Sequence, residues 1–166
     1  MRQLILVRHA KSSWDNPELD DFDRPLNKRG KRDAPFMAIL LAEKKVKPDL
    51  ILSSPAVRTK LTAIEIAKKL GIDKDKIIWN EKIYLASSSK LLKILTGIDD
   101  KVRSVMLIGH NPGLTDLQNY LCKEEIDNIP TCGIVCMRTQ KDWKSITSKD
   151  FELVFFDYPK KYFKKS

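Results

Sequence analysis

Residues 4–9 read Leu-Ile-Leu-Val-Arg-His, so four consecutive apolar residues are followed at once by an arginine and a histidine. A short apolar run of this kind is typical of a strand buried on both faces, as in a parallel sheet. The pattern returns at residues 104–110, where Ser-Val-Met-Leu-Ile-Gly precedes the second of only two histidines in the chain. The sequence therefore predicts two buried strands that each lead directly into a histidine, His9 and His110.

Strands and helices alternate along most of the remaining chain. Further strands are predicted over residues 49–53, 76–79, 134–139 and 151–156. Helices are predicted over residues 28–45, 55–70, 88–95 and 112–122. This alternation predicts an α/β fold, a three-layer α/β/α sandwich with a mostly parallel central sheet. Because no helix separates the last two strands, we expect them to pair as an antiparallel hairpin at one edge.

Several residues mark the expected helix ends. Asn27 is a suitable N-cap for the first helix, and Pro35 inside that helix predicts a kink or a break. Ser54 is expected to cap the second helix, with Pro55 at its first position, where a missing N–H costs nothing. Gly71 is the expected C-terminal stop of the second helix.

Composition predicts one soluble domain spanning residues 1–166. The chain is 42% hydrophobic and 32% charged, and its longest apolar runs are far too short to span a membrane. The run at residues 4–7 is also too short for a signal peptide. Three cysteines without a C-x-x-C motif argue against a disulfide framework, so the expected compartment is the reducing cytoplasm.

The net charge of +9 favours anionic partners without choosing among them. Most lysines are scattered, as expected of a solvated surface. The end of the chain, about residues 158–166, is predicted to be a frayed basic tail.

The charged residues gather at predicted strand ends. Arg8 and His9 follow one strand, His110 follows another, and Arg58 lies in the first turn of the helix after the strand at 49–53. In open α/β sheets, ligands bind beyond the carboxyl ends of the strands. A helix N-terminus favours anions, and an arginine fork matches phosphate oxygens. These residues together predict a phosphoryl-binding pocket.

Five segments then resemble the motifs of a known family. They are LVRHAKSSW at 6–14, DFDRPLNKRG at 21–30, LSSPAVRT at 52–59, IGHNPGL at 108–114 and IDNIPT at 126–131. They are similar to those of the histidine phosphatase superfamily, in the branch that includes the phosphoglycerate mutases. More closely, the whole chain resembles the short SixA-like phosphohistidine phosphatases. The resemblance implies a phosphoglycerate mutase-like fold and hydrolysis of phosphohistidine in a protein, or of a small phosphoester.

The resemblance also implies a mechanism. His9 attacks phosphorus and forms a phosphohistidine intermediate, which water hydrolyses. Arg8, Arg58 and His110 hold the non-bridging oxygens, and the backbone N–H of Asn111 adds a donor. Neutral His9 is required, and the neighbouring arginines disfavour its protonation. No metal or other cofactor is expected, because side chains supply the positive charge.

The general acid is open at the level of sequence. Glu81 resembles the position of the catalytic glutamate of the mutases and is the first choice, although it reads equally as a surface carboxylate. Asp23 and Asp15 are weaker candidates. Ala10 and Lys11 stand where the mutases have Gly and Glu, so mutase activity is not expected.

Rival interpretations remain. Residues 132–138 fit C-x₅-R, the spacing of cysteine phosphatases, but their apolar interior predicts a buried strand instead. A small-molecule phosphomonoesterase of the same superfamily and an inactive homologue used as a scaffold are also open. A phosphate- or nucleic-acid-binding module would explain the charge but requires neither histidine, so we expect no nucleic-acid or membrane partner. The oligomeric state is not predicted.

Overall fold

A computed structural model describes residues 1–163. In this part of the chain six strands form one sheet in the order β3-β2-β4-β1-β5-β6. The strands are β1 Arg2–Arg8, β2 Leu50–Ser53, β3 Ile78–Trp79, β4 Ser104–Gly109, β5 Ile134–Thr139 and β6 Glu152–Asp157. Strands β1 to β4 are parallel, whereas β5 pairs antiparallel with β1 and with β6. The predicted mixed sheet and its antiparallel edge hairpin are confirmed.

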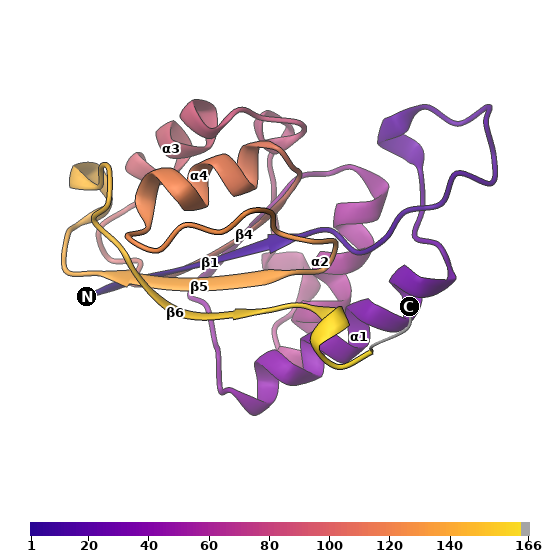
Figure 1. Cartoon of the computed structure of the whole chain (residues 1–166), viewed down its shortest axis with the longest axis horizontal. Helices are drawn as coiled ribbons and strands as arrows, with labels where there is room; N and C mark the ends of the chain where they lie inside the picture. Colours follow the sequence, from indigo (N-terminus) through magenta and orange to yellow (C-terminus); the bar gives the residue numbers. More distant parts are fainter. Residues whose placement is uncertain (164–166) are drawn as a thin grey trace.

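Two pairs of helices cover the two faces of the sheet. The helices are α1 Lys28–Glu43, α2 Val57–Leu70, α3 Ser88–Thr96 and α4 Gly113–Leu121. α1 and α2 lie on one face, and α3 and α4 lie on the other (Figure 1). The predicted three-layer α/β sandwich is therefore confirmed.

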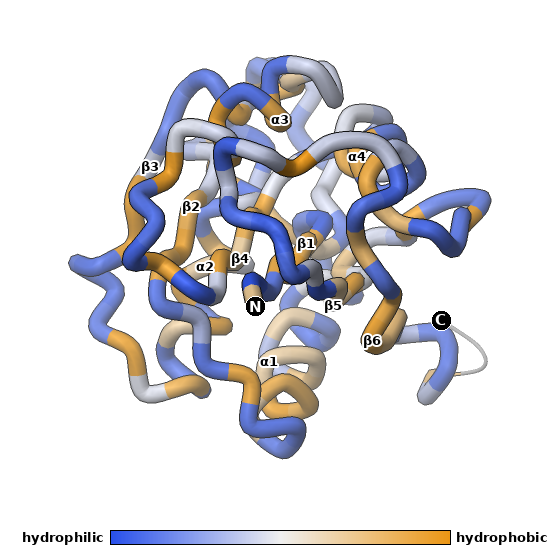
Figure 2. Tube along the Cα trace, turned by 90° about the vertical axis from the view of Figure 1, so that its left-hand side faces the viewer, coloured by the Kyte–Doolittle hydropathy of each residue, from blue (hydrophilic) through white to orange (hydrophobic). Residues whose placement is uncertain are grey.

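The apolar run at residues 4–7 forms the central part of strand β1, which is buried on both faces of the sheet. Leu4 and Leu6 pack into the core beneath α3 and α4, whereas Ile5 and Val7 pack into the core beneath α1 and α2. All four side chains are fully buried, because both faces of the strand are covered. Figure 2 shows the same arrangement, with hydrophobic segments inside and largely hydrophilic segments around them.

Two predicted helix boundaries are wrong. Of the kink or break expected at Pro35, the break does not occur, because helix α1 continues through this residue. The hydrogen bond that proline cannot make is offset by the packing of one face of α1 on the sheet, through residues such as Met37 and Leu41. Helix α2 begins at Val57 and not at Pro55, since Ser54 instead accepts a hydrogen bond from the N–H of Ala56 (3.2 Å).

Asn27 and Gly71 act as predicted. The side chain of Asn27 accepts from the N–H of Gly30 at 2.8 Å, and Gly71 ends α2 in the left-handed conformation (φ 72°). The third predicted strand is shorter than expected, because residues 74–76 form a 3₁₀ turn before β3.

The end of the chain is packed rather than frayed as far as residue 163. Pro159 is buried, and Phe163 lies edge-on to Phe36 of α1 at 4.7 Å between ring centroids. Residues 164–166 of the predicted tail lie outside the described residues. Across residues 1–163, none of the helices combines the length and the apolarity that crossing a bilayer would demand.

The start of helix α4 offers a stability prediction. A Cβ atom on Gly113 would lie 2.0 Å from the carbonyl oxygen of Ala86, so the backbone would have to move. We expect Gly113→Ala to lower the free energy of unfolding by about 1–3 kcal/mol, a typical cost of overpacking. Urea denaturation measures the change. Gly97→Ala is the matched control, since its nearest neighbour would be 3.6 Å away. Equal stability of the two variants would contradict the close approach.

Candidate active site

The carboxyl ends of three adjacent parallel strands bring the predicted site residues together. His9 follows β1, His110 follows β4, and Arg58 lies in the first turn of α2, after β2. They surround a cavity of about 220 Å³. Its lining residues are Arg8, His9, Lys11, Ser12, Trp14, Arg24, Arg58, Leu85, His110, Asn111 and Thr131. The predicted convergence of two imidazoles and two guanidinium groups is thus present in the structure.

His9 is held as a neutral imidazole with one free nitrogen. Its Nδ1 lies 2.7 Å from the carbonyl oxygen of Ala10, which can only accept, so Nδ1 carries the proton. The pKa of His9 is lowered to about 3. Burial is the main cause, and the charges of Arg58 and Arg8 act in the same direction, whereas the hydrogen bond to Ala10 raises the pKa. Nε2 therefore keeps its lone pair at neutral pH, as a nucleophile requires.

His110 lies beside His9, with 5.3 Å between the ring centroids. Its Nδ1 is 3.3 Å from a guanidinium nitrogen of Arg58, so Nδ1 accepts. Nε2 then donates to the hydroxyl oxygen of Ser54 at 2.8 Å. Burial lowers the pKa of His110 to about 3, helped by the nearness of His9 and Arg58. Both nitrogens of His110 are occupied, whereas His9 has one free.

The two predicted arginines each keep an unused donor. Arg8 donates from Nη1 to the carbonyl oxygen of Ile129 at 3.0 Å, and Arg58 donates from both Nη atoms to Asp21. The Nε–H groups of Arg8 and Arg58 are buried and have no acceptor within residues 1–163. Buried donors are almost always paired in folded proteins. Arg8 and Arg58 both line the cavity, so their guanidinium groups can bind oxygen atoms of a ligand there.

The cavity also contains a third guanidinium group, that of Arg24, which was not predicted from the sequence. Arg24 lines the cavity, is 7% exposed, and lies with its guanidinium carbon 3.5 Å from the centroid of the Trp14 ring. It donates to the Ser12 hydroxyl at 2.7 Å and to Asp21 at 3.1 Å. The strand-like bridge between Ser12 and Leu26 closes this loop and brings Arg24 to the cavity.

Asp21 links the site arginines. Its carboxylate accepts from Arg58 at 2.9 Å, from Arg24, and from the hydroxyl of Tyr84 at 2.5 Å. Burial opposes ionisation of Asp21, but the bonds from Tyr84 and Arg58 outweigh it and lower the pKa to about 2. Asp21 is therefore an ionised clamp for the arginines and holds no proton to donate at neutral pH. The only sequence signal for Asp21 and Arg24 was their place in the segment at 21–30.

Asn111 has a fixed side chain. Its amide nitrogen donates to Asn128 and to the carbonyl oxygen of Ile129, and its oxygen accepts from the backbone and hydroxyl of Thr115. These bonds anchor residues 126–131 beside the cavity, which Thr131 lines. The proposed role of the Asn111 backbone N–H stays a prediction.

The structure does not bring the candidate general acids to the cavity. Glu81 begins a 3₁₀ turn at Glu81–Ile83 and is exposed, whereas Tyr84 and Leu85 reach the site just beyond it. Asp15 and Asp23 are also exposed, and neither lines the cavity. Throughout the described residues, no three His, Cys, Asp or Glu side chains are grouped as a metal site requires.

The C-x₅-R segment is a buried strand, as predicted. Cys132 and Cys136 are fully buried, and burial raises the pKa of both thiols, to about 11 for Cys136. Arg138 is exposed on β5 and forms no anion-binding loop with Cys132.

The buried imidazoles predict a pH dependence of stability. In the folded protein the pKa of His9 and of His110 is about 3, below the ordinary value of 6.5. Unfolding therefore takes up protons once the pH falls below about 6.5. We expect the free energy of unfolding to be highest above pH 6.5 and to decrease steadily from there toward pH 3. Urea denaturation at pH 4 to 8 measures this, and the decrease should be shallower in His9→Gln. Imidazole titration near pH 6.5 in NMR spectra would contradict the prediction.

Comparison with known proteins places the chain in a family. Residues 4–81 match the family model described as histidine phosphatase superfamily, branch 1. An uncharacterised chloroplastic protein of Arabidopsis thaliana is 33% identical over 145 residues, which cover 82% of this chain and 66% of that protein. Phosphoserine phosphatase 1 of Hydrogenobacter thermophilus is 43% identical over 84 residues, covering 47% of this chain and 38% of the enzyme.

A solved structure extends the similarity over nearly the whole chain. The chain is similar to a protein from Agrobacterium tumefaciens provisionally assigned as phosphohistidine phosphatase SixA. Their sequences are 32% identical and the TM-score is 0.81, over 95% of this chain and 98% of the other. The chain therefore belongs to the histidine phosphatase superfamily and is a histidine phosphatase-like hydrolase. The fold and family predicted from the motifs are thereby confirmed.

Proposed function

We propose that this protein is a phosphohistidine phosphatase that acts through a covalent intermediate on His9. The state of His9 carries the proposal, because its Nδ1–H is tied to Ala10 and its Nε2 is free in a cavity with three guanidinium groups. Nε2 attacks phosphorus, and the bond from phosphorus to the substrate nitrogen breaks. The other ring nitrogen of the substrate histidine carries a proton from solvent, so the leaving nitrogen keeps the electron pair and the ring departs as neutral imidazole. Water then attacks the phosphorus on His9 and releases inorganic phosphate, which regenerates the neutral imidazole.

The positive charges have defined roles in this proposal. The guanidinium groups of Arg8 and Arg58 hold the non-bridging oxygens, whose charge is largest in the transition state. Arg24 adds charge at the mouth, and Asp21 fixes its orientation relative to Arg58. His110 accepts a proton when phosphate draws Arg58 away from its Nδ1, which makes it a further donor.

The choice of phosphohistidine as substrate rests on the leaving group. Among the described residues that line the cavity there is no carboxylic acid, and the nearby Asp21 is ionised. An alkoxide leaving group needs a proton donor, which typically contributes about 10²–10⁴-fold to the rate. A phosphohistidine whose other ring nitrogen has taken a proton from solvent releases neutral imidazole, whose conjugate acid has a pKa near 6.5, so no acid of the protein is needed at the leaving nitrogen. The exposed side chains of Trp14 and Leu85 at the rim suit contact with a protein surface.

Matched peptides test this proposal. Two peptides of one sequence, carrying phosphohistidine or phosphoserine at the same position, are compared as substrates. We expect kcat/KM for the phosphohistidine peptide to exceed that for the phosphoserine peptide by at least about 10³-fold, the contribution of the missing acid. An aryl phosphate such as 4-nitrophenyl phosphate should be hydrolysed at an intermediate rate.

The control for this test is Glu81→Gln. Because Glu81 is exposed and outside the cavity, the variant should hydrolyse all three substrates at the rate of the unmodified protein. Equal rates on the two peptides would favour a small-molecule phosphomonoesterase with its own proton donor. A selective loss of phosphoserine hydrolysis in Glu81→Gln would identify that donor as Glu81.

A further inference from the structure

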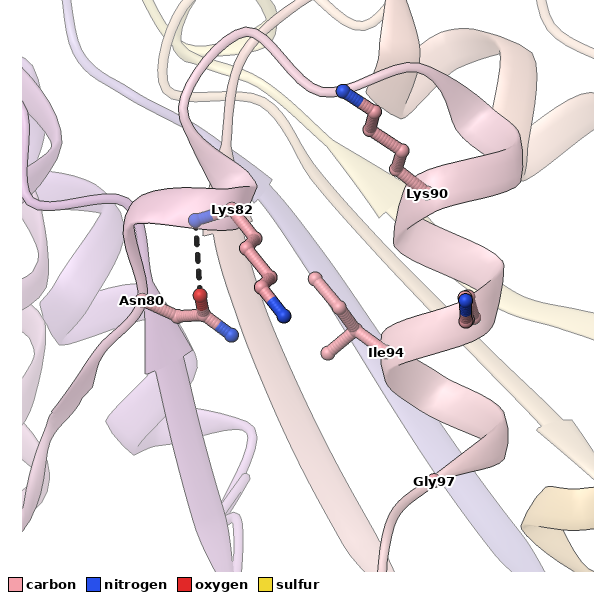
Figure 3. A pocket seen from close by; sticks show the side chains of 6 residues that line it. Asn80, Lys82, Lys90, Ile94 and Gly97 are labelled. Atoms are coloured by element: carbon pink, nitrogen blue, oxygen red, sulfur yellow. Dashed lines mark hydrogen bonds between the residues drawn. The ribbon is translucent and has the colours of Figure 1, made fainter.

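A second and larger cavity lies next to the candidate active site, between β3 and α3. Its volume is about 610 Å³. The lining residues are Asn80, Lys82, Lys90, Lys93, Ile94 and Gly97. Figure 3 shows that Lys82 extends across the opening toward Ile94 of α3, while Lys90 stands above it on the same helix. We call this feature the lysine cavity.

One short segment separates the lysine cavity from the active site. Asn80 follows β3 at the same edge of the sheet where His9 follows β1, because the two strands run parallel. Five residues along the chain, Leu85 lines the active-site cavity, and Tyr84 donates its hydroxyl to Asp21. Lys82 of the lysine cavity and Leu85 of the active-site cavity are only three positions apart, so the backbone at the two cavities is at most about 11 Å apart.

The charge of the lysine cavity is not neutralised by the protein. None of the ammonium groups of Lys82, Lys90 and Lys93 has an ion-pair or hydrogen-bond partner within residues 1–163. The bonds to the side chains of Asn80 and Ser87 are donated by the backbone N–H groups of Lys82 and Lys90. Glu81 is adjacent in sequence and forms no ion pair with them. The side chain of Ile94 and the methylene stems of the lysines supply apolar surface between the charges.

The form of the cavity favours carboxylates on a protein over a small phosphate compound. Specific phosphate sites commonly use arginine forks or free N–H groups at a helix N-terminus, whereas lysine binds phosphate as a point charge without fixing its orientation. Here the charges are on flexible lysines, and the N–H of Lys90 in the first turn of α3 is already bound by the Ser87 hydroxyl at 3.3 Å. An apolar surface with ammonium groups at its edges fits an acidic segment that has apolar side chains among its glutamates.

We propose that the lysine cavity receives an acidic segment of the phosphoprotein whose phosphohistidine occupies the active site. This deepens the proposed function and rests on it. The carboxylates of the segment bind to Lys82, Lys90 and Lys93. This binding raises the rate of productive encounter between the two proteins and leaves the rate of the chemical step unchanged.

Two phosphohistidine peptides test the proposal, identical except that glutamates flanking the phosphohistidine in one are glutamines in the other. At low ionic strength we expect about tenfold higher kcat/KM for the glutamate peptide, with a difference that shrinks as salt is added. The triple variant Lys82→Gln, Lys90→Gln, Lys93→Gln should lose this preference. Its hydrolysis of 4-nitrophenyl phosphate should match that of the unmodified protein.

The matched control removes the same charge elsewhere. Lys68, Lys101 and Lys144 are exposed and outside both cavities, and their replacement by glutamine should leave the preference intact. Equal kcat/KM for the two peptides with the unmodified protein would overturn the proposal. So would a preference that survives in the cavity variant.

A binding measurement separates this proposal from the proposed function. If neither peptide is hydrolysed, the proposed function fails, and fluorescence anisotropy of the labelled, unphosphorylated glutamate peptide decides the docking. Binding that is lost in the cavity variant and kept in the control supports docking, and absence of binding overturns it. Tighter binding of inorganic pyrophosphate through the same lysines would also overturn it, in favour of a small polyanion.

Discussion

Replacement of His9 by alanine is expected to abolish turnover while the protein still binds phosphate. The variant removes the only imidazole nitrogen in the cavity that is free of a protein partner, since both nitrogens of His110 are bound. Removal of a covalent nucleophile costs on the order of 10⁴-fold or more in kcat. Arg8 and Arg58 remain and keep their buried N–H donors, so binding of inorganic phosphate should weaken only in part.

Rapid-quench trapping with labelled phosphohistidine peptide tests this directly. The unmodified protein should accumulate an acid-labile, base-stable phosphoenzyme with the label on His9, and His9→Ala should not. His110→Asn is the informative control, because the two rings are only 5.3 Å apart and either could in principle attack. This control should form the phosphoenzyme more slowly, still on His9. Label on His110, or undiminished hydrolysis by His9→Ala, would contradict the mechanism.

The site residues that could be predicted from the sequence are those whose positions are set by the strands of the sheet. The apolar runs before His9 and His110 specify buried parallel strands, and the ends of such strands meet at one edge. Arg58 follows from the same logic, because the helix after β2 must begin at that edge. These placements need only the strand pattern and the rule for connecting parallel strands.

The parts that escaped prediction lie on loops. Asp21 and Arg24 reach the cavity because residues 10–26 fold back through the bridge between Ser12 and Leu26, and no periodic pattern encodes that return. Glu81 was the first choice for the general acid, with a surface carboxylate as the equal alternative. It lies outside the cavity, because a 3₁₀ turn directs it to solvent and presents Tyr84 instead. Loop conformation depends on individual hydrogen bonds rather than on the spacing of apolar residues.

Arg58→Ala is expected to lower kcat/KM by about 10²–10³-fold, corresponding to about 2.7–4 kcal/mol of lost transition-state stabilisation. The effect on folding should be smaller. Arg58 itself is 3% exposed, but its partner Asp21 has a side chain that is 40% exposed and keeps Arg24 and Tyr84 as partners. The variant therefore leaves no buried carboxylate without a partner. Arg58→Lys should recover only a small part of the activity, because a lysine retains the charge without the planar fork.

The Asp21→Asn variant distinguishes two roles of Arg58, which are binding of the phosphoryl group and stabilisation of the loop that carries Asp21. In this variant the guanidinium stays in the cavity but loses its ionic partner at 2.9 Å, so its position becomes less fixed while its charge is kept. If Arg58 acts on the transferring phosphoryl group, Asp21→Asn should lose far less activity than Arg58→Ala. Steady-state kinetics on the phosphohistidine peptide compare the three variants, with circular dichroism to confirm folding. Equal losses of activity in Asp21→Asn and Arg58→Ala would mean that the Arg58–Asp21 ion pair matters for the structure of the loop and not for phosphate binding. An unchanged kcat/KM in Arg58→Ala would remove Arg58 from the active site.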